Sequence, residues 1–153
     1  YRGGKYSAYE AGTRVPFIIS WPGSIKPSVS SALVCQIDLL ASFSNMFRQN
    51  IPAGDAMDSE NVMDALKGKT QKGRAVLVEQ GGALTLVKDN WKYIEPNKGV
   101  AYYKLTDTET GNSEQPQLYN LTEDIGEKNN VAEKYPEKVK ELATLLEQIK
   151  TRK

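Results

Sequence analysis

The chain has 153 residues, 39% of them hydrophobic, which is enough to bury one core or a small core plus part of another. Its 20 basic and 19 acidic residues are spread along the sequence, and the formal net charge of +1 argues against a nucleic-acid-binding surface or an anionic membrane as partner. Apolar runs stay short of the roughly 20 residues that a membrane-spanning helix needs. We therefore expect a soluble chain with no nucleic acid and no membrane among its partners.

Two residue counts restrict the chemistry. Cys35 is the single cysteine, which excludes an intramolecular disulfide and a thiolate metal cluster. Histidine is absent, which removes the commonest general base and excludes Ser-His-Asp or Cys-His catalysis within this chain. Any catalytic contribution must come from lysine, arginine, carboxylate or tyrosine side chains.

The first twenty residues join a polar loop to an apolar segment. A glycine-rich loop around Lys5 leads into residues 15–20, VPFIIS, in which the apolar residues do not alternate with polar ones. This pattern predicts a strand buried on both faces, as in a parallel sheet. Such a strand needs neighbours and only a short loop without signal-peptide features precedes it, so we expect the chain to be the tail of a larger protein.

A helical segment and an irregular one follow. Apolar residues at helical spacing predict a helix that begins at or just before Asp38, whose carboxylate we expect to accept amide hydrogen bonds in the first turn. Residues 48–61 are rich in Pro, Gly, Asp and Asn and predict an irregular connection. A short helix over residues 62–67, closed by Gly68, is expected next.

Beyond residue 70 the pattern is typical of a small antiparallel sheet. Strands are predicted over residues 75–79, 84–88, 91–94, 100–105 and 117–121, with a polar loop over 106–115. The pair Asp89-Asn90 predicts a tight hairpin turn between the second and third strands, in which aromatic and aliphatic residues alternate with lysine.

The last element is predicted to be a helix from about Pro136 to Lys150. Proline suits the first helical turn, and one apolar stripe repeats at helical spacing. The stripe consists of Val139, Leu142, Leu145, Leu146 and Ile149. We expect it to lie on the antiparallel sheet.

Three segments resemble sulfatases. A lysine, Lys5, stands five residues before EAGTRVP at residues 10–16, which is similar to a sulfatase segment with a lysine before Glu-Gly-Gly-x-Arg-x-Pro. Residues 34–40, VCQIDLL, resemble the opening of the next sulfatase helix. Residues 89–94 and 117–131 resemble the final sheet and turn of bacterial arylsulfatase-like enzymes. The chain thus resembles the C-terminal portion of a sulfatase of the alkaline-phosphatase-like superfamily.

The resemblance implies an α/β fold with an α+β C-terminal part. Residues 1–55 would be the end of a large alkaline-phosphatase-like α/β domain, and residues 56–69 would connect it to the next domain. Residues 70–153 would form a small C-terminal subdomain, in which an antiparallel sheet packs on a long C-terminal helix.

The resemblance also implies hydrolysis of sulfate esters by a formylglycine nucleophile, made from a Cys/Ser-x-Pro-x-Arg motif, with a divalent cation, usually calcium. Neither that motif nor the metal-binding residues occur in this chain, and Cys35 has no Pro or Arg at the required offsets. We therefore expect no metal ligand or cofactor within the chain, calcium and formylglycine in the full-length parent, and no activity from the fragment alone. The partner would be a sulfated small molecule or sulfated glycan, and the parent would be periplasmic or extracellular. The oligomeric state is left open.

One site residue is carried over from the family. Lys5 matches the lysine that contacts the substrate sulfate, where an ammonium can meet the negative ester and stabilise charge as the S–O bond breaks. Glu10 and Arg14 are interpreted as braces of the loop that satisfy each other and nearby backbone groups.

Two other groups of residues are given structural interpretations. The aromatic residues Trp91, Tyr93, Tyr102, Tyr103 and Tyr119 could stack on a sugar or aryl group, but alternating strand positions favour a place in the core or on the sheet faces. The acidic cluster Glu123, Asp124 and Glu127, with Asn129 and Asn130, does not follow calcium-loop spacing and is interpreted as a turn plus helix cap.

Two other functions stay open. A metal-dependent phosphatase or phosphodiesterase of the same superfamily would share the architecture but use two metals and a serine or threonine nucleophile. A non-catalytic binding module would instead use the aromatic sheet face as its binding surface.

Overall fold

The computed structural model describes residues 1–152, and the chain divides into two compact units. The first comprises Tyr1–Pro16 and Val78–Lys153, and the second comprises Phe17–Leu77. No helix in residues 1–152 has both the length and the apolar character that crossing a bilayer requires. The domain boundaries expected at residues 55 and 70 refer to a longer protein and stay a prediction.

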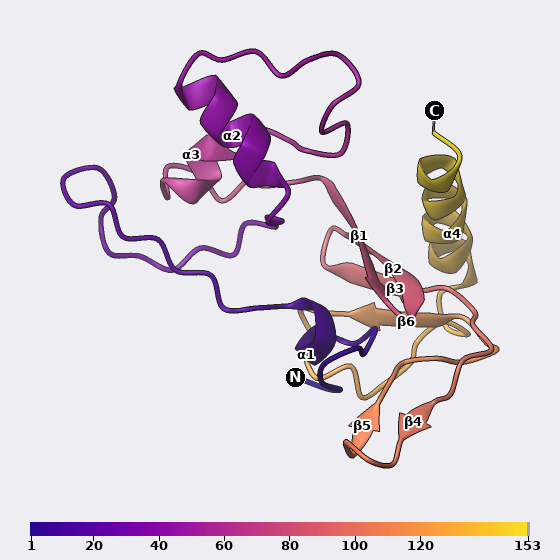
Figure 1. Ribbon diagram of the computed structural model, residues 1–153. Coiled ribbons are helices and arrows are strands. Elements are labelled where there is room, and N and C mark those ends of the chain that lie inside the picture. Colours follow the sequence, from indigo (N-terminus) through magenta and orange to yellow (C-terminus); the bar gives the residue numbers. More distant parts are fainter. Residues whose placement is uncertain (153) are drawn as a thin grey trace. The chain divides into compact units, whose positions relative to one another are not determined.

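A four-stranded sheet forms the centre of the first unit (Figure 1). The strands lie in the order β1–β2–β3–β6. Strand β3 pairs antiparallel with both β2 and β6. Their bounds are Val76–Gly81, Ala83–Lys88, Trp91–Ile94 and Gln117–Asn120. The predicted antiparallel sheet is confirmed, and each of these strands lies within two residues of the predicted segment.

The turn between β2 and β3 explains why this hairpin could be predicted. Asp89 and Asn90 both have positive φ, 51° and 62°, as a type I′ hairpin turn requires. Asp and Asn tolerate this conformation better than other residues with a side chain. The turn sets the register in which Leu86 lies opposite Tyr93.

The register also divides the sheet into two faces. Directly opposed residues share a face, so Lys92 and Tyr119 lie on one side and Tyr93 and Leu118 on the other. All four are buried, with at most 4% of their surface exposed. Both faces of this sheet are therefore covered, including the face that bears Lys92.

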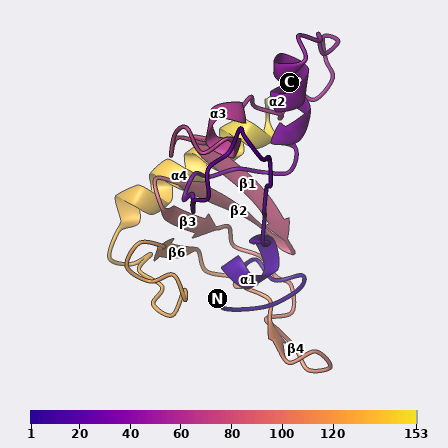
Figure 2. The same ribbon diagram turned by 90° about the vertical axis from the view of Figure 1, so that its left-hand side faces the viewer.

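Helix α4, Pro136–Lys150, covers the face that bears Tyr93 and Leu118 (Figure 2). It has the bounds predicted from the sequence. Leu142 and Leu146 from its apolar stripe are each 1% exposed. The predicted packing of this helix on the sheet is confirmed.

Truncation of the α4 stripe should destabilise the chain. Replacing Leu142 by alanine removes a buried side chain and leaves a cavity, and we expect the free energy of unfolding to fall by about 2–5 kcal/mol. Replacing the exposed Thr144 of the same helix by alanine should change it by less than about 0.5 kcal/mol. Urea denaturation of the two variants measures the difference, and equal losses would show that α4 does not pack as described.

The N-terminal segment covers the opposite face. Its short helix α1, Glu10–Thr13, was not predicted. Tyr9 packs edge-on against Tyr119 with the ring centroids 6.0 Å apart, and both hydroxyls donate to Oε1 of Gln117, at 2.9 and 2.8 Å. This packing places the start of the chain in the same compact unit as the sheet.

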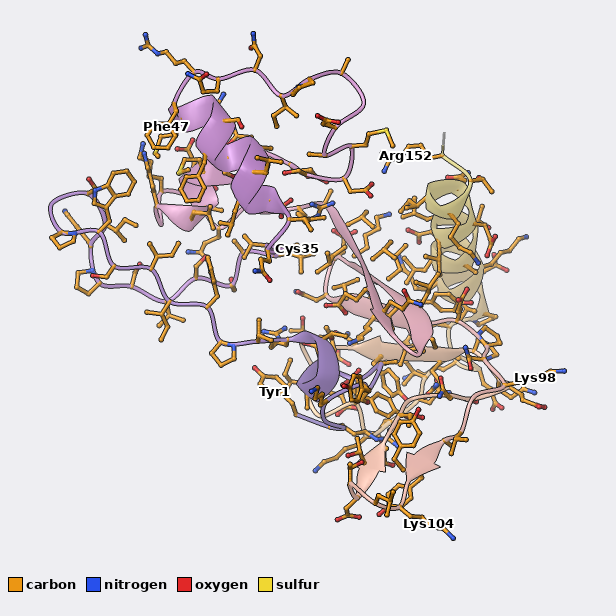
Figure 3. All side chains as sticks on the ribbon, in the orientation of Figure 1. Tyr1, Cys35, Phe47, Lys98, Lys104 and Arg152 are labelled. Carbon is orange, nitrogen blue, oxygen red and sulfur yellow. The ribbon has the colours of Figure 1, made fainter. Side chains whose placement is uncertain are left out.

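A two-stranded hairpin extends from this unit (Figure 1). It pairs β4, Tyr102–Tyr103, with β5, Thr108–Glu109, and the side chain of Lys104 points outward near its tip (Figure 3). The predicted strand over residues 100–105 is therefore reduced to two residues, and the predicted polar loop over 106–115 contains a strand. Leu105 is fully exposed, and of the four paired residues only Thr108 is buried.

The predicted buried strand over residues 15–20 is absent from the structure of residues 1–152. Val15 and Ile18 are 72% and 90% exposed, and Phe17 is 51% exposed. A strand is stabilised by a hydrogen-bonded neighbour, and no described strand pairs with this segment. The prediction of a buried strand here is therefore wrong for the described residues.

The second unit contains two helices. Helix α2, Asp38–Met46, starts at the predicted residue, and α3, Met63–Leu66, lies within the predicted range and is followed by Gly68 with φ +68°. Residues 48–61 contain neither helix nor strand, as predicted. Half-buried Cys35 lies just before α2 (Figure 3).

The role predicted for Asp38 is wrong. Its fully buried carboxylate accepts hydrogen bonds from the backbone amides of Cys35, at 2.9 Å, and Glu60, at 3.0 Å, rather than from the first helical turn. It also pairs with the guanidinium of Arg74. The residue before it, Ile37, is already in a helical conformation, so the carboxylate is free to bind the preceding turn and the segment after α2.

Candidate functional site

Lys5 lies on an exposed turn at the start of the first unit. The amide of Ser7 donates to the carbonyl oxygen of Gly4 at 2.9 Å, and Gly3 and Tyr6 have positive φ, 81° and 72°. The ammonium of Lys5 lies 4.9 Å from the centroid of the Tyr6 ring. The position is accessible to an anionic ligand, and the predicted contact of Lys5 with sulfate stays a prediction.

The turn after Lys5 is closed by a tight approach of the backbone. A Cβ at Gly12 would lie 2.1 Å from the carbonyl oxygen of Ser7, so only glycine fits there. The neighbouring Ala11 lies within α1, has no positive φ and donates its amide to the carbonyl oxygen of Arg2 at 3.0 Å. Alanine is therefore accommodated at the position where sulfatases usually carry glycine.

Glu10 and Arg14 form the contact expected of them. Oε2 of the buried Glu10 accepts a hydrogen bond from Nε of Arg14 at 2.6 Å. Burial alone would raise the pKa of Glu10, but the charges of Lys92 and Arg14 hold that pKa below its usual value. The pair fixes α1, and its role as a brace for Lys5 stays a prediction.

A buried cluster of charges, which the sequence did not reveal, joins α1 to the sheet. The side chain of Lys92 on β3 is fully buried, and its Nζ lies 2.9 Å from Oε1 of Glu10, 3.5 Å from Oε2 of Glu79 and 3.8 Å from Oε1 of Glu127. We call Glu10, Glu79, Lys92 and Glu127 the buried charge cluster. Its members come from segments far apart in the sequence, so no spacing could have predicted it.

Glu127 is the least compensated member of the cluster. Its Oε2 accepts the backbone amide of Glu10 at 2.7 Å, whereas its Oε1 has no hydrogen-bond donor among the described residues. Burial raises the pKa of Glu127 to about 7, against the attraction of Lys92. This carboxyl group therefore changes between its protonated and ionised forms near neutral pH.

This pKa predicts a pH-dependent stability. A carboxyl group whose pKa is higher in the folded than in the unfolded state favours folding below the unfolded pKa and loses that contribution as pH rises toward the folded pKa. For Glu127 the loss should fall between about pH 4.5 and 7. The lowered pKa of Glu10 acts in the opposite sense, and its contribution is lost only as pH falls below about 4.5.

Urea midpoints measured from pH 5 to 8 check this prediction. The urea midpoint of the variant Glu127→Gln should decrease less with rising pH than that of the unmodified chain. The variant Glu123→Gln, which alters an exposed carboxylate in the same turn, should keep the full decrease. If the urea midpoint changed equally with pH in all three proteins, this would contradict the assignment of the pH dependence to Glu127.

The acidic cluster at residues 123–130 forms a turn, as predicted, but not a helix cap, because α4 starts only at Pro136. Oδ2 of Asp124 accepts the amide of Asn129 at 2.8 Å, and Oδ1 of Asn130 accepts the amide of Leu118 at 3.0 Å. In residues 1–152 no group of three or more histidine, cysteine or acidic side chains is arranged to hold a metal ion. These residues therefore do not fit the divalent cation that sulfatases use.

The aromatic residues do not assemble into one stacking platform. Tyr93 and Tyr119 are buried on opposite faces of the sheet, as expected for core residues. Tyr102 and Tyr103 are about 40% exposed on the separate β4–β5 hairpin, and Trp91 packs edge-on against Tyr135 at 5.3 Å. The aromatic sheet face that a binding module would need is thus covered by protein.

Comparison with known proteins agrees with this fold. The family described as N-sulphoglucosamine sulphohydrolase, C-terminal, matches residues 4–152. An N-acetylgalactosamine-6-O-sulfatase of Bacteroides thetaiotaomicron is 49% identical over 99% of this chain and 30% of its own length. Arylsulfatase K of Gallus gallus is 30% identical over 95% of this chain and 27% of its own length.

A solved structure of a similar protein has the same fold over nearly the whole chain. A protein from work on the metabolism of multiple glycosaminoglycans by Bacteroides thetaiotaomicron is 49% identical, with a TM-score of 0.96, and the match covers 99% of this chain and 32% of that one. The chain spans about a third of the length of the relatives that it matches. The resemblance to sulfatases is confirmed, and the chain belongs to the N-sulphoglucosamine sulphohydrolase C-terminal family.

Proposed function

We propose that this chain is part of a sulfatase that hydrolyses 6-O-sulfated N-acetylgalactosamine in a sulfated glycan. The observation that supports this is the 49% identity over 99% of the chain to an N-acetylgalactosamine-6-O-sulfatase. The aligned region takes in the loop that carries Lys5, since it covers nearly all residues of the chain. The complete protein would act in the periplasm or outside the cell, as the resemblance to sulfatases leads us to expect.

Within that reaction Lys5 would contact the sulfate group. Its ammonium is exposed on a turn, within a loop fixed by backbone hydrogen bonds on either side. A positive charge there would bind the ester and stabilise the negative charge that develops on the bridging oxygen as the S–O bond breaks. A lysine can supply this as a point charge without a fixed bidentate geometry.

The remaining machinery would come from other parts of the complete protein. A formylglycine nucleophile and a calcium ion, which supply the attack on sulfur and the polarisation of the sulfate, are proposed by analogy with the family. The described residues include no set of metal ligands and the chain has no nucleophile motif. Accordingly, the 153-residue chain alone should hydrolyse nothing.

Product analysis tests the proposal. The complete protein would be incubated with N-acetylgalactosamine 6-sulfate or its 6-phosphate, and free sulfate and phosphate measured by ion chromatography. We expect sulfate release from the first compound and little phosphate release from the second. Phosphate release without sulfate release would instead support a phosphatase of the same superfamily, and turnover by the 153-residue chain alone would contradict the division of the site.

A further inference from the structure

The loop that carries Lys5 is held at both flanks by a single distant residue. On the C-terminal side of Lys5, the amide of Glu10 donates to Oε2 of Glu127 at 2.7 Å. On the N-terminal side, Nη1 of Arg2 donates to the carbonyl oxygen of Glu127 at 2.7 Å. More than one hundred residues of chain separate Glu127 from this loop, so the contacts are purely tertiary.

The conformation of Glu127 is unusual for a residue that only fills space. It is fully buried, it has a positive φ of 50°, and its Oε1 accepts no hydrogen bond within residues 1–152. A left-handed backbone in a residue with a long side chain and an unsatisfied buried oxygen each cost free energy. Neither cost is needed to form a turn, which glycine or asparagine would do without strain.

Charged groups surround the side chain of Glu127 and hold it in one position. Lys92 from β3 lies 3.8 Å away, and Glu10 from α1 and Glu79 from β1 are bound to the same ammonium. Arg2, whose Nη1 donates to the carbonyl oxygen of Glu127, also donates from Nε and Nη2 to the two carboxylate oxygens of Glu109 on β5, each at 2.8 Å. The side chain of Glu127 is thus enclosed by charges that are themselves anchored to the sheet.

We propose that Glu127 is a positioning residue for Lys5, holding the two flanks of the Lys5 loop so that the ammonium is presented to the substrate sulfate. This inference rests on the proposed function, because it assigns a role to Glu127 through Lys5. Glu127 itself contacts no substrate. Its side chain secures the flank that leads into α1, and its backbone carbonyl secures the flank at Arg2.

Hydrogen exchange followed by mass spectrometry tests the structural half in the complete protein. The variant Glu127→Ala should speed exchange of the amides in residues 3–13 by about tenfold or more, because it removes a buried acceptor from the loop. Glu127→Gln keeps an acceptor oxygen at the same place and should stay within about threefold of the unmodified protein. The matched control Glu123→Ala, at an exposed acid in the same turn, should leave these amides unchanged.

Kinetics with N-acetylgalactosamine 6-sulfate test the functional half. Glu127→Ala should lower kcat/KM by about 10- to 100-fold, since small displacements of a catalytic group carry losses of this size. If Glu127 acts through Lys5, the double variant Lys5→Met with Glu127→Ala should lose no more activity than Lys5→Met alone. Glu127→Gln should recover most of the activity that Glu127→Ala loses.

The outcomes separate the two proposals. Full activity of Lys5→Met would contradict the proposed sulfate contact, and with it the positioning role of Glu127. A large loss in Lys5→Met, together with unchanged exchange and activity in Glu127→Ala, would overturn the positioning role alone, as would losses that multiply in the double variant. If Glu127→Ala does not fold, Glu127→Asp, which withdraws the carboxylate by one methylene, replaces it with the same expected and contradicting results.

Discussion

Replacing Lys92 by methionine is expected to lower the free energy of unfolding by about 3–5 kcal/mol, the range for removing one partner from a buried ion pair. The substitution retains most of the volume of the side chain but leaves the carboxylates of Glu10, Glu79 and Glu127 without the ammonium that they surround. Urea denaturation of the chain at pH 7 measures the effect.

A matched substitution on the same sheet isolates the burial of the charge. Lys88 forms an ion pair with Glu141 at 2.7 Å where both side chains reach solvent, so Lys88→Met should lose far less stability than Lys92→Met. Adding Glu10→Gln to Lys92→Met should restore part of the stability, since it removes a buried charge that would keep only Arg14 as an ion-pair partner. Equal losses in the Lys88 and Lys92 variants would mean that the buried charge cluster does not stabilise the fold.

Replacing Lys5 by methionine is expected to reduce kcat/KM of the complete protein by about 100- to 1000-fold, as when one preorganised donor to a developing charge is removed. Thermal stability should hardly change, because Lys5 is exposed and methionine preserves its apolar stem. The two measurements together distinguish loss of a substrate contact from loss of the fold.

The control for Lys5 is another exposed lysine in the same unit. Lys140 lies on α4, which covers the sheet face opposite to the N-terminal segment, and Lys140→Met should keep activity within about twofold. Undiminished turnover in Lys5→Met would contradict the proposed sulfate contact, whatever the family of the chain.

The elements that could be predicted from the sequence are those with local signals. Pro136 and the leucine stripe predicted α4 with its observed bounds, and Asp89-Asn90 predicted the β2–β3 hairpin. Asp38 marked the start of α2 correctly, although its hydrogen-bond partners were not those expected. In each case the determining interactions lie within a few residues along the chain.

Features that depend on what covers a surface could not be predicted. The strand expected over residues 15–20 has a buried-strand pattern but no hydrogen-bonded neighbour among the described strands. Lys92 has the alternation of a solvated strand position, and it is buried because the N-terminal segment packs on that face. The sequence around Glu127 predicts a polar turn, and nothing in it indicates the contact with Glu10.

The candidate site was predictable only in part, for the same reason. The pairing of Glu10 with Arg14 follows from residues one helical turn apart. The link from this pair to Lys92, Glu79 and Glu127 joins residues that are about 70 to 120 positions away in the chain. Patterns of local spacing carry no information on such contacts, which are seen only in the folded structure.

A crystal structure of the complete protein with bound N-acetylgalactosamine 6-sulfate would test the central claim most directly. The account predicts Nζ of Lys5 within about 2.7–3.2 Å of a sulfate oxygen, with the amide of Glu10 still bonded to Glu127. A sulfate group held entirely by other residues, with the ammonium of Lys5 still over the ring of Tyr6, would contradict it.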